Sequence, residues 1–313
     1  MKKIPCRKSF TETLLELARK DPSIVALASD SRGSVTLGEF AEALPEQFVE
    51  CGIAEQDEVG IAAGMASCGK KAFVCAPACF LSTRSLEQVK VDVAYSHTNV
   101  KVIGISGGIS YGALGMSHHS LQDVAVMRAI PGMTVILPAD EYQTREMTKA
   151  LAEFDGPVYV RMGRGAVENV YTDEFVPFEI GKANQLTEGD DLAIIACGET
   201  VVQAVHAAES LKKAGIHVRV LDMHTIKPLD EEAVVRACKE CKAILTVEES
   251  SPHGGLGEAV SHVAAENHPA PIKIIGLPDE PLVSGTSTEL YEYYGLDAAG
   301  IAASARALLE KLS

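Results

Sequence analysis

Short apolar segments alternate with longer helical segments along almost the whole chain of 313 residues. In the first half, the apolar segments of strand length are residues 24–28, 72–76, 100–105, 135–138 and 158–161. Between them, apolar residues recur at helical spacing, for example over residues 37–44, 81–94 and 141–153. Strands and helices that alternate in this way form parallel sheets with helices on both faces. The sequence therefore predicts an α/β fold.

Residues 163–189 interrupt this alternation and are predicted to link two domains. A second alternation follows, with strand-length apolar segments at residues 192–196, 218–221, 243–247 and 272–275. A chain of this length has room for about two domains. We therefore expect two doubly wound α/β domains, which comprise residues 1–185 and 186–313.

The composition argues against two classes of partner. Lysine and arginine total 28 against 43 acidic residues, a net charge of -15, so no nucleic acid partner is expected. No apolar run reaches the ~20 residues that span a bilayer, so no membrane partner is expected. The first residues lead into a predicted helix without the apolar core of a signal peptide. The eight cysteines lie mostly in apolar segments, which suits a reducing compartment, and we expect a cytoplasmic protein.

Cys238 and Cys241 form a Cys-x-x-Cys pair. Structural zinc sites with this spacing need a second pair of cysteine or histidine ligands. The sequence offers no second pair, so we expect no metal site in this chain. We interpret both cysteines as side chains at the end of a helix.

Residues 51–66 (CGIAEQDEVGIAAGMA) place one carboxylate where an extended segment turns into a helix. Glu55 follows a glycine-containing turn and opens a helix of small apolar residues. Open α/β sheets bind ligands at junctions of this kind. The alternative is structural, because the helix dipole favours an acidic residue in the first turn. The small residues Gly60, Ala63 and Gly64 also predict a closely packed helix face at an interface.

A glycine-rich loop, residues 106–120 (SGGISYGALGMSHHS), separates the strand predicted at 100–105 from the helix predicted at 122–129. Long loops inside compact domains are usually functional. This loop lacks the Gly-Lys-Ser/Thr ending of a Walker loop and the GxGxxG pattern of dinucleotide-binding folds. Its histidines, His118 and His119, are candidate functional residues because a glycine-rich loop gives them no core role.

Six separated segments resemble, in order, the transketolase and 1-deoxyxylulose-5-phosphate synthase group of thiamine-diphosphate enzymes. They are residues 52–56 (GIAEQ), 80–81 (FL), 115–118 (GMSH), 131–140 (PGMTVILPAD), 222–230 (DMHTIKPLD) and 253–257 (HGGLG). The resemblance covers essentially the whole chain. It implies a pyrimidine-binding-type domain followed by a transketolase C-terminal-type domain. Nothing here resembles the family's diphosphate-binding domain with its Gly-Asp-Gly…Asn signature, so the chain resembles the C-terminal subunit of a split transketolase.

The resemblance implies roles for five residues. Glu55 would hydrogen-bond the aminopyrimidine of thiamine diphosphate, and an apolar surrounding would favour its protonated form. Phe80 would stack on the pyrimidine ring, although an ordinary core phenylalanine is the alternative. His118 would contact the substrate beside the reactive carbon. Asp30 would lie near the thiazolium ring and Arg161 would bind a substrate phosphate, although charges are common at loop ends.

The resemblance also implies the reaction and the assembly. It implies transfer of a two-carbon ketol unit between sugar phosphates or similar substrates. The cofactors would be thiamine diphosphate and Mg²⁺, the metal held mainly by a separate N-terminal diphosphate-binding subunit. We expect two copies of each subunit. The alternatives are the beta subunit of the first component of a 2-oxo acid dehydrogenase and a non-catalytic scaffold subunit.

Two departures from the family leave the substrate open. Leu114 stands where an aspartate usually reads a sugar hydroxyl, and Ser106 stands where transketolases have a phosphate-contacting histidine. A buried leucine cannot accept a hydrogen bond, so the usual hydroxyl would lose a partner at a cost of ~1–3 kcal/mol. We therefore expect a substrate with altered stereochemistry, with branching or with a different anionic tail.

Overall fold

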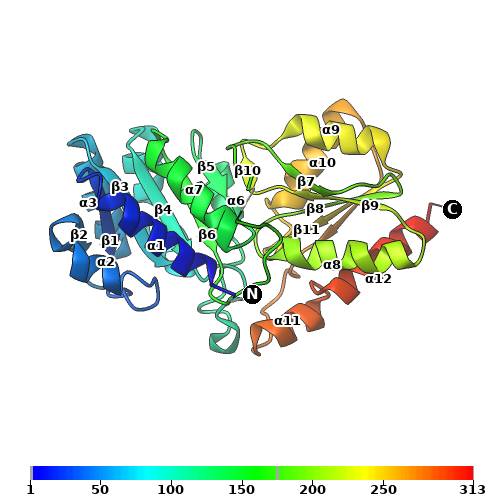
Figure 1. Cartoon of the computed structure of the whole chain (residues 1–313), viewed down its shortest axis with the longest axis horizontal. Helices are drawn as coiled ribbons and strands as arrows, with labels where there is room; N and C mark the ends of the chain where they lie inside the picture. The colour runs from blue at the N-terminus through cyan, green and yellow to red at the C-terminus, as the bar shows by residue number, and fades with distance from the viewer. Residues whose placement is uncertain (1–2, 174–175, 313) are drawn as a thin grey trace.

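The computed structural model of the chain describes residues 3–173 and 176–312. Two sheets of mainly parallel strands lie side by side, and helices cover both faces of each sheet (Figure 1). The predicted class, two doubly wound α/β domains, is confirmed. None of the helices formed by these residues combines the length and the apolar character needed to cross a membrane.

The first sheet has seven strands in the order β10-β5-β6-β4-β3-β1-β2. Six of them are parallel, and the edge strand β10, which comes from the second half of the chain, pairs antiparallel with β5. The strands are β1 (Ile24–Ala28), β2 (Phe48–Glu50), β3 (Lys71–Pro77), β4 (Val100–Ile105), β5 (Thr134–Ile136), β6 (Val158–Met162) and β10 (Thr225–Lys227). The longer helices are α1 (Cys6–Ala18), α2 (Gly38–Ala43), α3 (Glu55–Ser67), α4 (Ala78–Arg84), α6 (Asp123–Ala129) and α7 (Glu141–Glu153).

The second sheet has five strands in the order β12-β11-β8-β9-β7. Only β7, at one edge, runs antiparallel to its neighbour. The strands are β7 (Asn184–Thr187), β8 (Leu192–Ala196), β9 (Val218–Asp222), β11 (Ile244–Val247) and β12 (Ile272–Ile275). The helices are α8 (Thr200–Lys213), α9 (Glu231–Glu240), α10 (Leu256–Asn267), α11 (Ser287–Tyr294) and α12 (Ala298–Glu310).

Both faces of the first sheet are buried, because alternate residues of each strand enter different cores. In β1, Val25 and Leu27 belong to a core that also contains residues of α3 and α6. Ile24 and Ala26 belong to the core formed with α1 and α7. The first of these cores continues into the second domain, where it includes residues of α9 and α10. One of the hydrophobic cores therefore extends across both domains.

One predicted helix is interrupted. Residues 81–94 were expected to form a single helix, but the chain forms α4, the short α5 (Leu86–Gln88) and a π-helical segment, η2 (Val89–Tyr95). The Ser82 and Ser85 hydroxyls donate to carbonyl oxygens four residues earlier, at 2.6 and 2.7 Å. Hydroxyl side chains that bond in this way bend helices. Short elements with weak periodicity, β7, β10 and α11, were not predicted, and the boundary between residues 185 and 186, which β7 spans, stays a prediction.

Asp140 ties the linker to the first domain. Its Oδ1 accepts the Gln143 N–H at 2.9 Å and so caps α7. Its Oδ2 accepts the N–H groups of Val170 and Tyr171, both at 2.9 Å. The Asp140 side chain is fully buried, so water cannot replace these three bonds.

We predict that Asp140→Ala destabilises the protein by about 2–4 kcal/mol, because it removes a helix cap and leaves two further N–H groups unpaired. The shift in the urea unfolding midpoint measures the effect. Asp297→Ala is the matched control, since Asp297 caps α12 through the Gly300 N–H only. Equal shifts for the two variants would contradict the role of Asp140 in holding the linker.

Candidate active site

The candidate site lies at the carboxyl-terminal edge of the first sheet. β1 pairs with β2 on one side and with β3 on the other, so the strand order reverses between β1 and β3. Open α/β sheets bind ligands at such a switch point. Helices α3 and α4 begin at this edge, and the glycine-rich loop, residues 106–120, leaves from it.

Glu55 is the first residue of α3, as the sequence predicted. The residue is only 4% exposed. Arg84 Nη1 donates to both carboxylate oxygens of Glu55, at 2.9 and 3.0 Å. The apolar surrounding that we expected for Glu55 is therefore incomplete, because a guanidinium group lies against the carboxylate.

An unbroken series of contacts joins Glu55 to His118. Arg84, besides binding Glu55, places its guanidinium carbon 4.2 Å from the centroid of the Phe80 ring. The Phe80 and His118 rings meet edge to face, with centroids 5.3 Å apart. The Tyr111 ring also contacts His118, with ring centroids 5.3 Å apart. The structure thus brings together three of the predicted residues, Glu55, Phe80 and His118. We call these three residues the Glu55 set.

A second carboxyl group lies one turn further along α3. Glu58 is fully buried, and its Oε1 accepts the Cys75 N–H at 3.2 Å. Burial raises the pKa of Glu58 to about 8, and the charges of Glu55 and Glu50 act in the same direction. At neutral pH the Glu58 carboxyl is therefore largely protonated and uncharged. Of the two acids, only Glu55 then needs a positive partner, which Arg84 supplies.

A buried ion cluster anchors the glycine-rich loop. Arg161, in β6, lies 3.5 Å from the carboxylate oxygens of both Asp123 and Glu249. Its Nη2 also donates to the main-chain oxygen of Glu249 at 2.5 Å. Glu249 Oε1 in turn accepts the Ile109 N–H at 2.7 Å. A Cβ at Gly108 would collide with Arg161 and Glu249, so this glycine lets the loop pack directly on the cluster.

Two predicted residues lie apart from the Glu55 set. Arg161 is only 4% exposed, and although burial alone would lower its pKa, Asp123 and Glu249 outweigh it and raise the pKa. This enclosed position does not favour the expected phosphate binding, which stays a prediction. Asp30 is exposed after β1, where its N–H donates to Glu50 Oε1 at 2.7 Å. Its expected place near a thiazolium ring also stays a prediction.

Two positions at which family members usually contact the substrate differ from expectation in their burial or their contacts. Leu114 was expected to be buried, but it is 53% exposed on the glycine-rich loop. Ser106 is fully buried with φ 59°, and its Oγ has no hydrogen-bond partner among the described residues. His119 Nε2 donates to the Gly112 carbonyl at 3.0 Å, so His119 holds the loop together.

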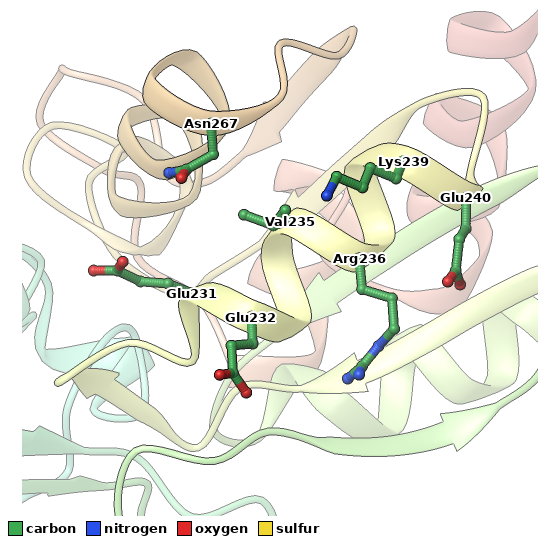
Figure 2. Close-up of a pocket in the computed structure, with 7 residues that line it drawn as sticks. All are labelled: Glu231, Glu232, Val235, Arg236, Lys239, Glu240 and Asn267. Atoms are coloured by element: carbon green, nitrogen blue, oxygen red, sulfur yellow. The ribbon is translucent and has the colours of Figure 1, made fainter.

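Two hollows elsewhere in the molecule do not contain the Glu55 set. One, with a volume of about 650 Å³, lies between the domains and is lined by many acidic groups, among them Glu168, Glu199, Glu249, Glu292 and Asp297. The other, of about 420 Å³, lies beside α9, where charged side chains of both signs project in different directions (Figure 2). Neither hollow is lined by Glu55, Phe80 or His118.

The described residues also show how the cysteine pair is used. Cys238 lies near the end of α9 and Cys241 follows the helix, as predicted, and both are buried free thiols. Across residues 3–173 and 176–312, no three His, Cys, Asp or Glu side chains are grouped so that they could hold a metal ion.

Sequence reasoning missed three residues of the site, namely Arg84, Glu58 and Tyr111. Helical spacing could have found two of them, because Arg84 is four residues after Phe80 and Glu58 is three after Glu55. Tyr111 carried a weaker signal, since only its position in the glycine-rich loop distinguishes it.

The fold and the site together define a class of protein. Its members have two doubly wound α/β domains, and at the switch point of the first sheet a buried carboxylate and an aromatic ring are joined through one arginine.

Comparison with known proteins narrows this class. Residues 2–169 match the transketolase pyrimidine-binding domain, and residues 181–301 match the transketolase C-terminal domain. The chain is 58% identical over 308 residues to an apulose-4-phosphate transketolase subunit of Phocaeicola vulgatus, with 98% of each chain covered. It is 39% identical to a 6-deoxy-6-sulfo-D-fructose transketolase subunit of a Clostridium species, over 97% of this chain and 94% of that one.

Comparison with a solved structure supports membership of the same family. The chain superimposes on a split-gene transketolase, described as an inactive beta4 tetramer, with a TM-score of 0.90. The two chains are 37% identical, and 98% of this chain and 99% of that one are covered. The chain belongs to the transketolase family, as the resemblance implied, and over nearly its full length it is similar to chains named as transketolase subunits and to a split-gene transketolase.

Glu58 provides a test by pH. Its folded-state pKa of about 8 lies above the ordinary value of 4.5, so the folded protein keeps a proton that the unfolded chain releases between these values. The wild type should therefore lose stability relative to Glu58→Gln as the pH rises from 5 to 8, by roughly 2–4 kcal/mol, because one pKa unit corresponds to about 1.4 kcal/mol. Urea unfolding at several pH values measures the difference.

The exposed Glu87→Gln is the control for this experiment and should follow the wild type at every pH. Parallel stability curves for the wild type and Glu58→Gln would show that Glu58 is ionised in the folded protein and would contradict the description above.

Proposed function

We propose that the chain is the C-terminal subunit of a thiamine-diphosphate-dependent transketolase. It would transfer a two-carbon ketol unit between sugar phosphates or similar substrates, and it would need a separate N-terminal diphosphate-binding subunit. The observation that carries the proposal is the arrangement of Glu55, Phe80 and Arg84. A planar, nitrogen-bearing group is hydrogen-bonded to the carboxylate and stacked on the aromatic ring. An aminopyrimidine ring requires the same two contacts.

The residues at this edge fit such a ring. Thiamine diphosphate supplies, when bound, the nucleophilic carbon that attacks the ketose carbonyl. In the proposal, Glu55 holds the proton at the pyrimidine nitrogen and Phe80 stacks on the ring. Arg84 would move aside, because its side chain is 49% exposed and water can replace its contacts when it leaves Glu55 and Phe80. Asp30 near the thiazolium ring remains part of the proposal.

His118 is the residue proposed to face the reacting end of the sugar. Its ring contacts those of Phe80 and Tyr111 edge to face, and these two contacts restrict its orientation. Its Nδ1 lies 2.9 Å from the Ser117 hydroxyl, and no described residue binds its Nε2. Nε2 is therefore available to a substrate carbonyl or hydroxyl oxygen.

The surface around Glu55 supports the proposal of a partner chain. Ile53, Ile61, Val91 and Tyr95, on α3, the turn before it and η2, are 41% to 86% exposed. A Cβ at Gly60 or Gly64 would meet nothing, so the helix face expected to pack at an interface is open in this chain. We propose that the diphosphate-binding subunit, which would also hold Mg²⁺, covers this face. We propose two copies of each subunit and a cytoplasmic location.

We propose a ketose phosphate as the substrate, with apulose 4-phosphate as the first candidate. Two relatives are named for apulose 4-phosphate, including the one that is 58% identical. The apolar, exposed Leu114 on the loop that carries His118 supports a sugar other than the usual pentose and hexose phosphates.

The two alternatives have weaker support. A 2-oxo acid dehydrogenase subunit would have the same layout, but the similarity to named transketolase subunits covers nearly the full length of both chains. A non-catalytic scaffold would not require Glu55, Phe80 and His118 to be linked by side-chain contacts. In this chain Arg84 contacts Glu55 and Phe80, and Phe80 contacts His118.

The test uses this chain co-purified with the product of a neighbouring reading frame, thiamine diphosphate and Mg²⁺. Glu55→Gln should lower ketol transfer by about 100-fold or more, as expected when a proton-handling group at the reacting centre is lost. Circular dichroism and the unfolding midpoint should stay at the wild-type values.

Glu16→Gln, an exposed substitution of the same chemistry on α1, is the matched control and should leave turnover unchanged. Near-normal turnover by Glu55→Gln would rule out the proposed role. Lipoyl-dependent oxidation of 2-oxo acids by the wild-type pair, without ketol transfer, would favour the alternative enzyme.

A further inference from the structure

Both ends of the glycine-rich loop are embedded in a hydrophobic core formed mainly by the second domain. Ile109, near the start of the loop, is fully buried in this core. Leu121, directly after the end of the loop, belongs to the same core, and its carbonyl oxygen accepts the Ser251 N–H at 2.9 Å. The second domain therefore supports the loop that carries His118, although all three residues of the Glu55 set lie in the first domain.

A segment of the second domain, residues 284–287, lies against the middle of the loop. A Cβ at Gly112 would collide with the main-chain oxygen of Gly285, and a Cβ at Gly115 would lie 2.8 Å from the Ser284 hydroxyl. Both loop glycines also have positive φ angles, 32° and 70°, which side chains disfavour. The two glycines therefore allow the loop to approach this segment closely.

The start of α11 makes residues 284–287 a firm support. Thr286 is the N-cap of this helix, and it forms a capping box with Glu289, whose Oε2 accepts the Thr286 N–H at 2.8 Å. The next residue, Ser287, donates its hydroxyl to the Ser110 carbonyl oxygen of the loop at 3.4 Å. The helix start and the loop are therefore joined by a hydrogen bond as well as by close packing.

The loop glycines that meet this segment also hold the loop histidines. The Gly115 carbonyl oxygen accepts the His118 N–H at 2.9 Å, and the Gly115 N–H donates to the Gly112 carbonyl oxygen at 3.2 Å. His119 Nε2 bonds the same Gly112 oxygen at 3.0 Å. A continuous path of main-chain contacts therefore leads from residues 284–287 to His118.

Tyr291, also on α11, provides a second path to the loop. Its hydroxyl donates a hydrogen bond to the Glu249 carboxylate, and Glu249 Oε1 accepts the Ile109 N–H at 2.7 Å. Burial and the charge of Glu249 raise the pKa of Tyr291 well above its ordinary range, so the hydroxyl keeps its proton and stays a donor. Tyr291 thus orients the carboxylate that holds the start of the loop.

We propose that the second domain positions His118 for the sugar substrate, with Tyr291 as a positioning residue and residues 284–287 as the surface on which the loop rests. The inference rests on the proposed ketol transfer, because it takes His118 as the residue that contacts the sugar. Tyr291 does not touch the substrate and acts on His118 only through the loop. A displacement of about 1 Å at a reacting group can lower a rate about 100-fold, so the second domain controls turnover without supplying a catalytic group.

Steady-state kinetics of the reconstituted pair, with apulose 4-phosphate as the ketose, provide the first test. Tyr291→Phe removes only the hydroxyl and should lower kcat/KM about 10-fold, the effect of losing a hydrogen bond to a charged group. Gly112→Ala, which displaces the loop from Gly285, should lower kcat/KM about 100-fold. The matched controls should leave kcat/KM unchanged: Tyr293→Phe, at a tyrosine 70% exposed on the same helix, and Gly38→Ala, where a Cβ would meet nothing.

A double-mutant cycle separates positioning from a general loss of structure. In the His118→Ala background, Tyr291→Phe should change kcat/KM less than about twofold, because the residue on which Tyr291 acts is absent. The full loss persisting in that background would overturn the proposal, as would normal turnover by Tyr291→Phe with His118 intact. Calorimetry should give wild-type affinity of the Tyr291→Phe pair for thiamine diphosphate, since Glu55 lies outside the loop.

Hydrogen exchange in the reconstituted pair is independent of turnover. The backbone amides of residues 107–115 should exchange about 10-fold faster in Tyr291→Phe than in the wild type, because the loop has lost a restraint. Their exchange in Tyr293→Phe should match the wild type, and equal rates in all three proteins would contradict the proposal. If the wild-type pair transfers no ketol unit but the loop exchanges faster in Tyr291→Phe, the support of the loop by the second domain stands and the proposed reaction falls.

Discussion

The ion cluster of Arg161, Asp123 and Glu249 is the interaction on which the site depends. Glu249 comes from the second domain, while the other two residues come from the first. Buried ion pairs contribute little net stability, but removing one member leaves an unpaired buried charge and is strongly destabilising. The cluster therefore fixes geometry more than it adds stability: it sets the position of one domain on the other. Through the Ile109 N–H it also fixes the base of the glycine-rich loop, which carries His118.

The functional groups lie at an edge that this chain does not close by itself. Glu55 is buried and Phe80 is partly buried, and the half-exposed Arg84 contacts both of them. Apolar side chains around α3 remain uncovered. In the proposed assembly, this edge would become an enclosed, water-excluding site only when the two chains meet, so catalysis would depend on their association. The solved relative described as an inactive beta4 tetramer is in keeping with this proposal.

Local sequence patterns predicted the central elements well, because they depend on short-range periodicity and caps. The helix that begins at Glu55 and the strand at Val100–Ile105 form as expected. Contacts between distant segments could not be read from such patterns. The pairing of Arg84 with Glu55 depends on how α4 packs beside α3, and the enclosure of Arg161 depends on a carboxylate 88 residues away. Edge strands such as β10 were missed for the same reason, since a short strand is defined by its partner.

Calorimetric titration of thiamine diphosphate with Mg²⁺ tests the central claim most directly. It is performed on this chain alone and on the chain co-purified with its partner chain. A chain that supplies only the pyrimidine-binding half of the site should show no detectable binding alone and tight binding in the pair. Tight binding by the isolated chain would contradict the account, because a complete diphosphate and metal site would then lie within this chain.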